Sequence, residues 1–150
     1  LDRDVLSWRA ANGLDAELAD QLYAVRGCIE PEACRIAAVS ANDVQLQQIL
    51  ALFGAIAAQD GDLVSHVAAD VAFHLAIFAA TGNPFFITLG NAICTALELA
   101  FRQSQGRRRM SDGELVLHGE VAREIARRRP TSAGRAMERL LAMSRQALVE

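Results

Sequence analysis

The sequence contains no lysine: all 15 of its basic residues are arginine, they are outnumbered by 18 acidic residues, and the formal net charge is −3. A protein that binds DNA or RNA by itself neutralises phosphate groups with an excess of basic side chains. The charge balance therefore argues against a chain that binds nucleic acid without another domain.

Long apolar runs are missing as well, although hydrophobic residues make up 52% of the chain. A transmembrane helix needs about 20 consecutive apolar residues, and polar residues such as those of the TGNP segment at 81–84 interrupt the long apolar stretches. The opening segment, LDRDVLSW, is polar and does not have the form of a secretory leader. We therefore expect a cytoplasmic protein with no membrane partner.

Motifs of several enzyme classes are absent too. The sequence has no glycine-rich phosphate loop, no G-x-S-x-G nucleophile motif and no recognisable Cys–His pair. Cys28, Cys34 and Cys94 are an odd set without C-x-x-C spacing, which favours buried, reduced thiols over disulfides.

What the sequence does contain is helical periodicity along almost its whole length. The expected helices span about residues 14–39, 42–59, 63–80, 84–102, 111–128 and 130–150. Pro31 kinks or splits the first of these. The candidate N-caps are Ser40 or Asn42 for the second helix and Ser111 or Asp112 for the fifth. Short connections favour antiparallel neighbours, so we predict an all-α bundle.

Polar residues interrupt the apolar surface of the expected helix at 63–80. His66, Asp70 and His74 follow one another at steps of four, so they share one face. One interpretation is a half-exposed face on which Asp70 is hydrogen-bonded nearby. The other is half of a metal site, because an imidazole and a carboxylate one turn apart can bind the same divalent ion. His118 is the remaining histidine, and spacing alone leaves both interpretations open.

A second polar stripe lies on the expected helix at 84–102. It consists of Asn91, Thr95, Glu98 and Arg102. The stripe is either a solvent-exposed face or the lining of a cavity in which Asn91 and Thr95 bind hydroxyl groups of a small ligand. Arg26 lies beside an apolar stripe, where it either extends to solvent or holds a carboxylate with two hydrogen bonds.

Four segments together resemble a known family. In order and spacing, LYAVRGCIEPEACRIAA, DVAFHLAIFAATGNPFF, LHGEVAREI and RAMERLLAM resemble the FCD effector-binding domain of FadR-type GntR transcriptional regulators. The D-x-x-x-H pattern before T-G-N-P is the most specific element. Residues 1–13 resemble the linker that follows a winged helix-turn-helix domain, and 14–150 the effector domain. The first residue is Leu1 and not methionine, so we expect a piece of a longer protein.

The resemblance implies a bundle of about six to seven helices around a central ligand cavity. The cavity would sense a small organic acid, with a sugar acid as the candidate for this chain. The protein would be a homodimer that binds operator DNA only through the missing N-terminal domain. Arg26 matches the arginine that meets the carboxylate of the effector, and Asn91 and Thr95 are further effector-binding candidates.

Many members of that family also hold a divalent metal such as zinc or nickel with one aspartate and three histidines. Asp70, His74 and His118 match three of these ligands, whereas the fourth position falls on Leu140. Leucine cannot coordinate an ion. The resemblance therefore implies either a weaker site with three protein ligands, or a pocket that binds the effector alone.

Two other functions compete with a sensor domain. Three protein ligands with an open position are typical of catalytic zinc sites, so Asp70, His74 and His118 would also suit a small metal-dependent enzyme, although no general base is apparent. A purely structural dimerisation module is the other alternative. We expect the chain not to be an enzyme.

Overall fold

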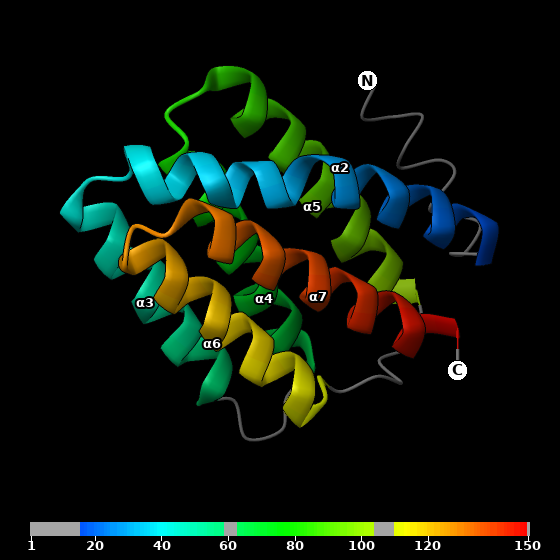
Figure 1. Ribbon diagram of the computed structural model, residues 1–150. Helices are drawn as coiled ribbons and strands as arrows, with labels where there is room; N and C mark the ends of the chain where they lie inside the picture. Colours follow the sequence, from blue (N-terminus) through cyan, green and yellow to red (C-terminus); the bar gives the residue numbers. More distant parts are fainter. Residues whose placement is uncertain (1–15, 59–62, 104–109, 150) are drawn as a thin grey trace.

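The computed structural model describes residues 16–58, 63–103 and 110–149, and these contain six α-helices and no strand. The helices, labelled as in Figure 1, are α2 (Ala16–Ser40), α3 (Asp43–Ala57), α4 (Leu63–Ala80), α5 (Pro84–Gln103), α6 (Asp112–Ala126) and α7 (Pro130–Val149). The predicted all-α class is confirmed, and no helix of the described part is long and apolar enough to cross a membrane. The expected linker at 1–13 lies outside the described residues.

Reciprocal hydrogen bonds fix the starts of two helices. At α3, the side chain of Asn42 accepts a bond from the backbone N–H of Gln45, and the side chain of Gln45 accepts one from Asn42 N–H, both at 2.9 Å. Ser111 and Glu114 form the same capping box at α6. The predicted alternatives are thereby resolved, because the hydroxyl of Ser40 instead donates to a carbonyl oxygen inside α2.

The prediction that Pro31 splits the first helix is wrong. Helix α2 runs from Ala16 to Ser40 with Pro31 inside it. A proline removes one intrahelical hydrogen bond, and here α2 packs against α4, α5, α6 and α7. Tertiary packing along the whole helix therefore outweighs the local preference of one residue.

The TGNP segment forms a tight reversal between α4 and α5. Gly82 has a φ of 65°, the left-handed conformation that ends many helices and that a residue without a side chain adopts most easily. The Thr81 hydroxyl donates to the carbonyl oxygen of Phe78 at 2.6 Å. The Asn83 side chain then accepts the backbone N–H of Phe85 at 3.0 Å, so this short sequence satisfies both helix ends.

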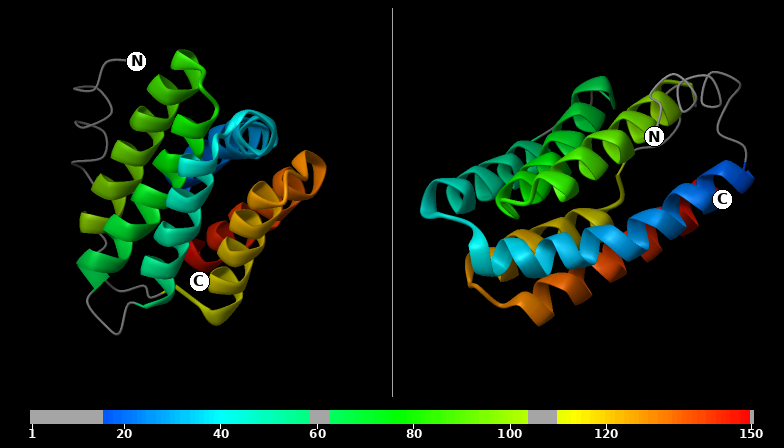
Figure 2. Two further views of the ribbon diagram at one scale, coloured as in Figure 1. Left: turned by 90° about the vertical axis from the view of Figure 1, so that its left-hand side faces the viewer. Right: turned by 90° about the horizontal axis from the view of Figure 1, so that it is seen from above.

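The helices form two layers. Figure 2 shows α3, α4 and α5 side by side in one layer and α2, α6 and α7 in the other. Figure 1 shows α2 and α7 next to each other and running in opposite directions. The largest fully buried side chains lie in the core between these helices, and they include Phe73, Phe78, Ile49, Ile56, Ile125 and Met137. Burial of such side chains stabilises the fold by about 2 kcal/mol each.

Glycines allow the closest approaches between helices. A Cβ atom added to Gly90 of α5 would lie 2.4 Å from the ring of Phe78, so the phenylalanine occupies the space that a side chain would need. A Cβ atom on Gly134 of α7 would lie 2.6 Å from the guanidinium of Arg35. Arg35 can therefore cross α7 and bind Glu138 at 2.6 Å.

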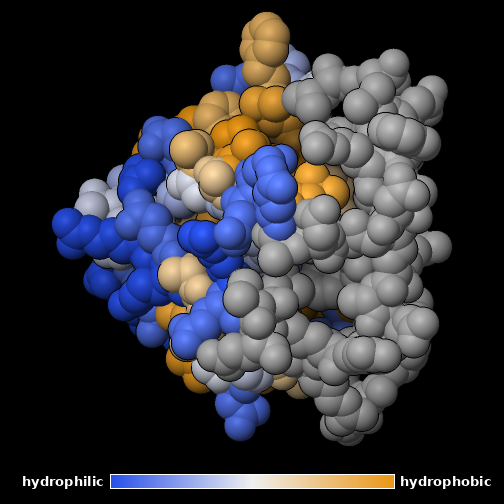
Figure 3. Space-filling model, turned by 90° about the vertical axis from the view of Figure 1, so that its right-hand side faces the viewer, coloured by the Kyte–Doolittle hydropathy of each residue, from blue (hydrophilic) through white to orange (hydrophobic). Residues whose placement is uncertain are grey.

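Hydrophilic side chains cover much of the described surface at the end where α2 begins and α7 ends (Figure 3). An ion pair between Arg145 and Asp20, with Nε and Oδ1 3.0 Å apart, joins α7 to α2. Both side chains are exposed, and such pairs contribute at most about 1 kcal/mol. The apolar core, and not surface charge, therefore holds this end of the bundle together.

The cysteines divide between the core and the surface. Cys34 and Cys94 are buried and free, and burial raises the pKa of both thiols, that of Cys94 to about 12. They are therefore protonated at neutral pH. Cys28 is exposed, so the expectation that all three cysteines are buried is wrong for this residue, which lies on an outward face of α2 near the exposed Val25.

Candidate metal and effector site

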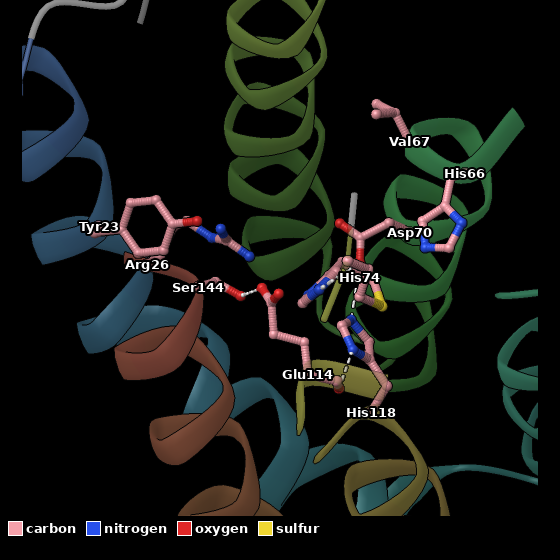
Figure 4. A pocket seen from close by; sticks show the side chains of 10 residues that line it. Tyr23, Arg26, His66, Val67, Asp70, His74, Glu114, His118 and Ser144 are labelled. Atoms are coloured by element: carbon pink, nitrogen blue, oxygen red, sulfur yellow. Dashed lines mark hydrogen bonds and ion pairs between the residues drawn. The ribbon is translucent and has the colours of Figure 1, made fainter. Parts of the chain in front are cut away.

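A pocket lies between α2, α4, α6 and α7, and Figure 4 shows the side chains that surround it. Its ionisable side chains are Tyr23, Arg26, His66, Asp70, His74, Glu114 and His118. The structure therefore brings four of the predicted site residues together: Arg26 from α2, Asp70 and His74 from α4, and His118 from α6.

Three of these side chains offer metal-ligating atoms at one point. One ligand atom from each of Asp70, His74 and His118 lies within 4.8 Å of the others. Asp70 Oδ1 is 2.8 Å from Nε2 of His118 and 3.8 Å from Nε2 of His74. Ligand atoms about 2.1 Å from a tetrahedral ion lie about 3.4 Å apart, so small adjustments would suffice. The three residues thus fit a divalent metal by both chemistry and position.

The hydrogen bonds of His118 favour a cation at this point. Its Nδ1 lies 2.8 Å from the carbonyl oxygen of Glu114, and its Nε2 lies 2.8 Å from Asp70 Oδ1. Both partners are acceptors, so each contact requires either a hydrogen on the ring nitrogen or a cation bound to it. With a metal at Nε2 the ring stays neutral while Nδ1 donates to the carbonyl, which is the usual arrangement of a ligating histidine.

His74 is held from the opposite side by a buried carboxylate. Nδ1 of His74 is 2.8 Å from Oε2 of Glu30, a close polar contact although it lacks the alignment of a hydrogen bond. Glu30 also binds Arg26, with Oε1 and Nε 2.5 Å apart. All three residues are at most 3% exposed. A buried chain of polar contacts therefore connects the predicted effector arginine to a predicted metal ligand.

The charges in this chain of contacts are fixed at neutral pH. Burial alone would raise the pKa of Glu30, but Arg26 and His74 outweigh it and lower the pKa to about 2. Burial would likewise raise the pKa of Asp70, but the hydrogen bond from His118 and the neighbouring His74 hold it below its ordinary range. Burial would lower the pKa of Arg26, and Glu30 more than compensates. All three groups are therefore ionised.

Packing orients both imidazole rings. Phe73 is fully buried and meets the edges of His74 and His118, with ring centroids 5.7 and 5.4 Å away. The two imidazoles are themselves 5.7 Å apart and nearly perpendicular. Neither ring can turn freely, because an edge-to-face contact with a buried phenylalanine restricts both.

Other predicted site residues lie elsewhere. Asn91 is exposed and Thr95 is half-buried, and the Thr95 hydroxyl donates to the Asn91 carbonyl oxygen within α5 at 2.8 Å. The structure therefore does not bring these two effector-binding candidates into the pocket lining. Leu140 is 1% exposed and belongs to the hydrophobic core, while Ser144, one turn later on α7, lines the pocket.

Sequence reasoning missed two buried acids. Glu30 follows Arg26 by four residues, a spacing that places the two side chains together on a helix and that could have suggested the pair. Glu114 caps α6 and accepts a hydrogen bond from the Ser144 hydroxyl at 2.7 Å. No pattern in the sequence indicates that second contact, since it depends on how α6 and α7 meet.

Replacing Glu30 by glutamine tests the buried pair. The metal-free variant is expected to lose about 2 kcal/mol of stability at neutral pH, because Arg26 keeps a hydrogen bond but loses the opposite charge. The pKa of Glu30 is lowered from 4.5 to about 2, so its contribution is present above about pH 4.5 and disappears as the pH falls through about 2. The variant should therefore lose less stability than the wild type over that acid range.

Urea unfolding in EDTA, from neutral pH downwards, measures this difference. Glu32→Gln is the matched control, because Glu32 lies on the same helix but forms a half-exposed pair with Arg35. Its cost should stay below about 1 kcal/mol. Equal costs for the two variants would show that Glu30 is not in a buried ion pair.

Comparison with known proteins adds family information to this geometry. A family model described as the FCD domain matches residues 21–143. A protein of Escherichia coli described as the galactonate operon transcriptional repressor is 31% identical over 104 residues, which cover 69% of this chain. Two solved structures also resemble the fold. A GntR protein of Streptococcus agalactiae has a TM-score of 0.71 and 26% sequence identity, and the match covers 87% of this chain. A GntR-family regulator of Pseudomonas syringae has a TM-score of 0.75 and 22% sequence identity, and the match covers 90% of this chain.

These relatives are considerably longer than the chain. It spans 45% of the Escherichia coli repressor, and 59% and 56% of the two structures. The likeness therefore concerns one part of each relative.

Proposed function

We propose that this chain, which belongs to the FCD domain family, is the effector-sensing part of a GntR-type transcriptional regulator. In this proposal it binds a small organic acid in the pocket of Figure 4, beside a divalent metal held by Asp70, His74 and His118. The observation that carries the proposal is the meeting of these three ligands with the buried Arg26 in one pocket. The regulator would act as a cytoplasmic homodimer and bind operator DNA through a domain outside this chain.

Charge explains why metal and acid belong together. The buried region around the pocket contains one arginine, Arg26, and three carboxylates, Glu30, Asp70 and Glu114. An acid entering that region would meet an excess of negative charge, and Arg26 is already paired with Glu30. Bringing another anion into a buried site is costly unless a cation compensates it. A divalent ion at Asp70 supplies the missing charge and leaves an open position for the carboxylate of the acid.

The small size of the pocket supports a regulatory role. The centres of water molecules can occupy a volume of about 40 Å³ in it. Measured in this way, one water molecule needs about 10–15 Å³. About three waters fit, so we expect a larger acid to displace some of the side chains or helices that surround the pocket. Because the effector then favours one arrangement of the helices over another, its binding can change the geometry of attached DNA-binding domains.

Glu114 is poorly suited to be the general base that the alternative, a metal-dependent enzyme, would need. Glu114 is the one acid besides Asp70 in the described lining, and a general base must be free to take a proton. Its carboxylate instead accepts hydrogen bonds from Ser111 and Ser144. Sugar acids are the first class of effector to test, because the Escherichia coli relative is described as a galactonate operon repressor.

A thermal-shift screen tests the proposed function. Galactonate, succinate and a long-chain acyl-CoA are added to the EDTA-treated and the zinc-loaded chain. One acid class should raise the melting temperature of the zinc-loaded chain, by roughly 5–10 °C at 100 times its dissociation constant, and remain chemically unchanged. Turnover of an acid would support the enzyme, and no response to any of them would support a structural module.

Asp70→Asn provides the variant for this screen, because it weakens the metal site with little change in shape. It should abolish most of the zinc-dependent rise in melting temperature. The control is Asp43→Asn, since the Asp43 side chain is almost fully exposed at the start of α3 and does not line the pocket.

A further inference from the structure

One nitrogen of the pocket is left without a partner. His66 lies one turn before Asp70 on α4 and lines the pocket, where Figure 4 shows its ring next to Asp70. Nε2 of His66 is shielded from solvent and has no hydrogen-bond partner. Buried polar atoms nearly always have partners in folded proteins. This nitrogen therefore requires a water molecule or a ligand in the pocket.

The other polar groups of the described lining are already engaged. Arg26 pairs with Glu30, and Asp70 with His118. Glu114 accepts hydrogen bonds from serine hydroxyls of α6 and α7. The remaining buried nitrogen without a hydrogen bond, Nδ1 of His74, is in close contact with Glu30. His66 thus differs from its neighbours in having a free hydrogen-bonding position directed at the pocket.

The distribution of charge indicates which chemical group fits there. In the proposed site the carboxylate of the acid already has its partners in Arg26 and in a divalent ion at Asp70. The arginine of the pocket, Arg26, projects from α2 on the other side (Figure 4). A hydroxyl group is neutral and can either donate or accept, so it matches an imidazole nitrogen with or without its hydrogen. An acid that carries hydroxyl groups can therefore bind Arg26 with its carboxylate and His66 with a hydroxyl group.

We propose that Nε2 of His66 binds a hydroxyl group of the effector, so that the pocket selects hydroxy acids over plain carboxylic acids. The carboxylate end of the ligand lies toward Arg26 and the metal ligands, and the hydroxyl end lies toward His66. This inference rests on the proposed function, because it takes the pocket to be the site of an acid.

The test compares two six-carbon acids, galactonate with its hydroxyl groups and hexanoate without them, by calorimetry on the zinc-loaded chain. His66→Phe keeps a ring of similar size and removes both nitrogens, whereas His66→Gln returns a polar nitrogen near the position of Nε2. We expect His66→Phe to weaken galactonate at least about tenfold and hexanoate by no more than about twofold. His66→Gln should recover a substantial part of the loss for galactonate.

The outcomes separate this inference from the proposed function. If galactonate binds the wild type and His66→Phe equally well, His66 does not contact the ligand and the inference is overturned, while the sensor function stands. An equal loss for both acids also overturns it, because His66 would then only support the fold. If the wild type binds neither acid, both the hydroxy-acid inference and a sugar-acid sensor are contradicted.

Discussion

Replacing Arg26 by alanine is expected to weaken effector binding by about 2–5 kcal/mol, which corresponds to a loss of roughly 30-fold or more. Arg26 is 3% exposed and is the one arginine in the described lining of the pocket. A carboxylate that enters the pocket would lose this partner in a region that already contains Glu30 and Asp70. Calorimetry with the acid selected by the screen measures the change.

The same substitution is expected to destabilise the protein. The structure shows that Glu30 would remain buried without its partner. Leaving one charge of a buried pair unpaired costs about 3–5 kcal/mol. The double variant Arg26→Ala/Glu30→Ala should recover part of this stability without recovering the acid affinity. Arg35→Ala, which breaks half-exposed ion pairs, is the control.

Recovery of acid affinity in the double variant would contradict the assigned role of Arg26. It would mean that the single variant fails because of the unpaired Glu30, and that the arginine does not contact the acid. If Arg26→Ala binds the acid as tightly as the wild type does, the arginine likewise does not contact the acid.

Replacing Leu140 by histidine is expected to tighten zinc binding more than tenfold, or by at least about 1.4 kcal/mol. The family resemblance implies that this position of α7 is that of the fourth ligand, and ligand atoms of Asp70, His74 and His118 already lie within 4.8 Å of one another. A fourth imidazole would complete a tetrahedral set. The metal-free variant should lose about 1–3 kcal/mol, because a polar ring replaces a core side chain that is 1% exposed.

Melting curves of wild type and variant, in EDTA and in excess zinc, test this expectation. Zinc should restore the stability that the variant loses, since a metal that binds the native state stabilises it by mass action. Leu141→His is the matched control, because Leu141 is similarly buried but points in another direction around the helix. A zinc-dependent rise no larger in Leu140→His than in the wild type would show that this position does not face the metal.

The helices were predictable because each has a local cause. Periodic apolar residues, the capping residues Asn42 and Ser111, and the conformational freedom of Gly82 act over a few positions of the chain. Pro31 shows the limit of that reasoning. Its effect on α2 is decided by the packing of four other helices against it, which no local pattern contains.

The sequence indicated four of the side chains that meet in the pocket, but not their electrostatics. Asp70 and His74 share a helix face, and the resemblance to a known family pointed to His118 and Arg26. The burial of Glu30 could not be predicted from the sequence, because an arginine and a glutamate four residues apart usually form a solvated ion pair on the surface. Only the burial of both side chains shows that Arg26 is already neutralised, and hence that an acid needs a further positive charge.

The account depends most on the claim that the pocket binds an acid only together with a divalent cation. The measurement is a calorimetric titration of the acid selected by the screen into the EDTA-treated and the zinc-loaded chain, side by side. The account predicts one site per chain with zinc and no detectable binding without it, because Glu30, Asp70 and Glu114 outnumber Arg26. Equal affinity in the two preparations would contradict it.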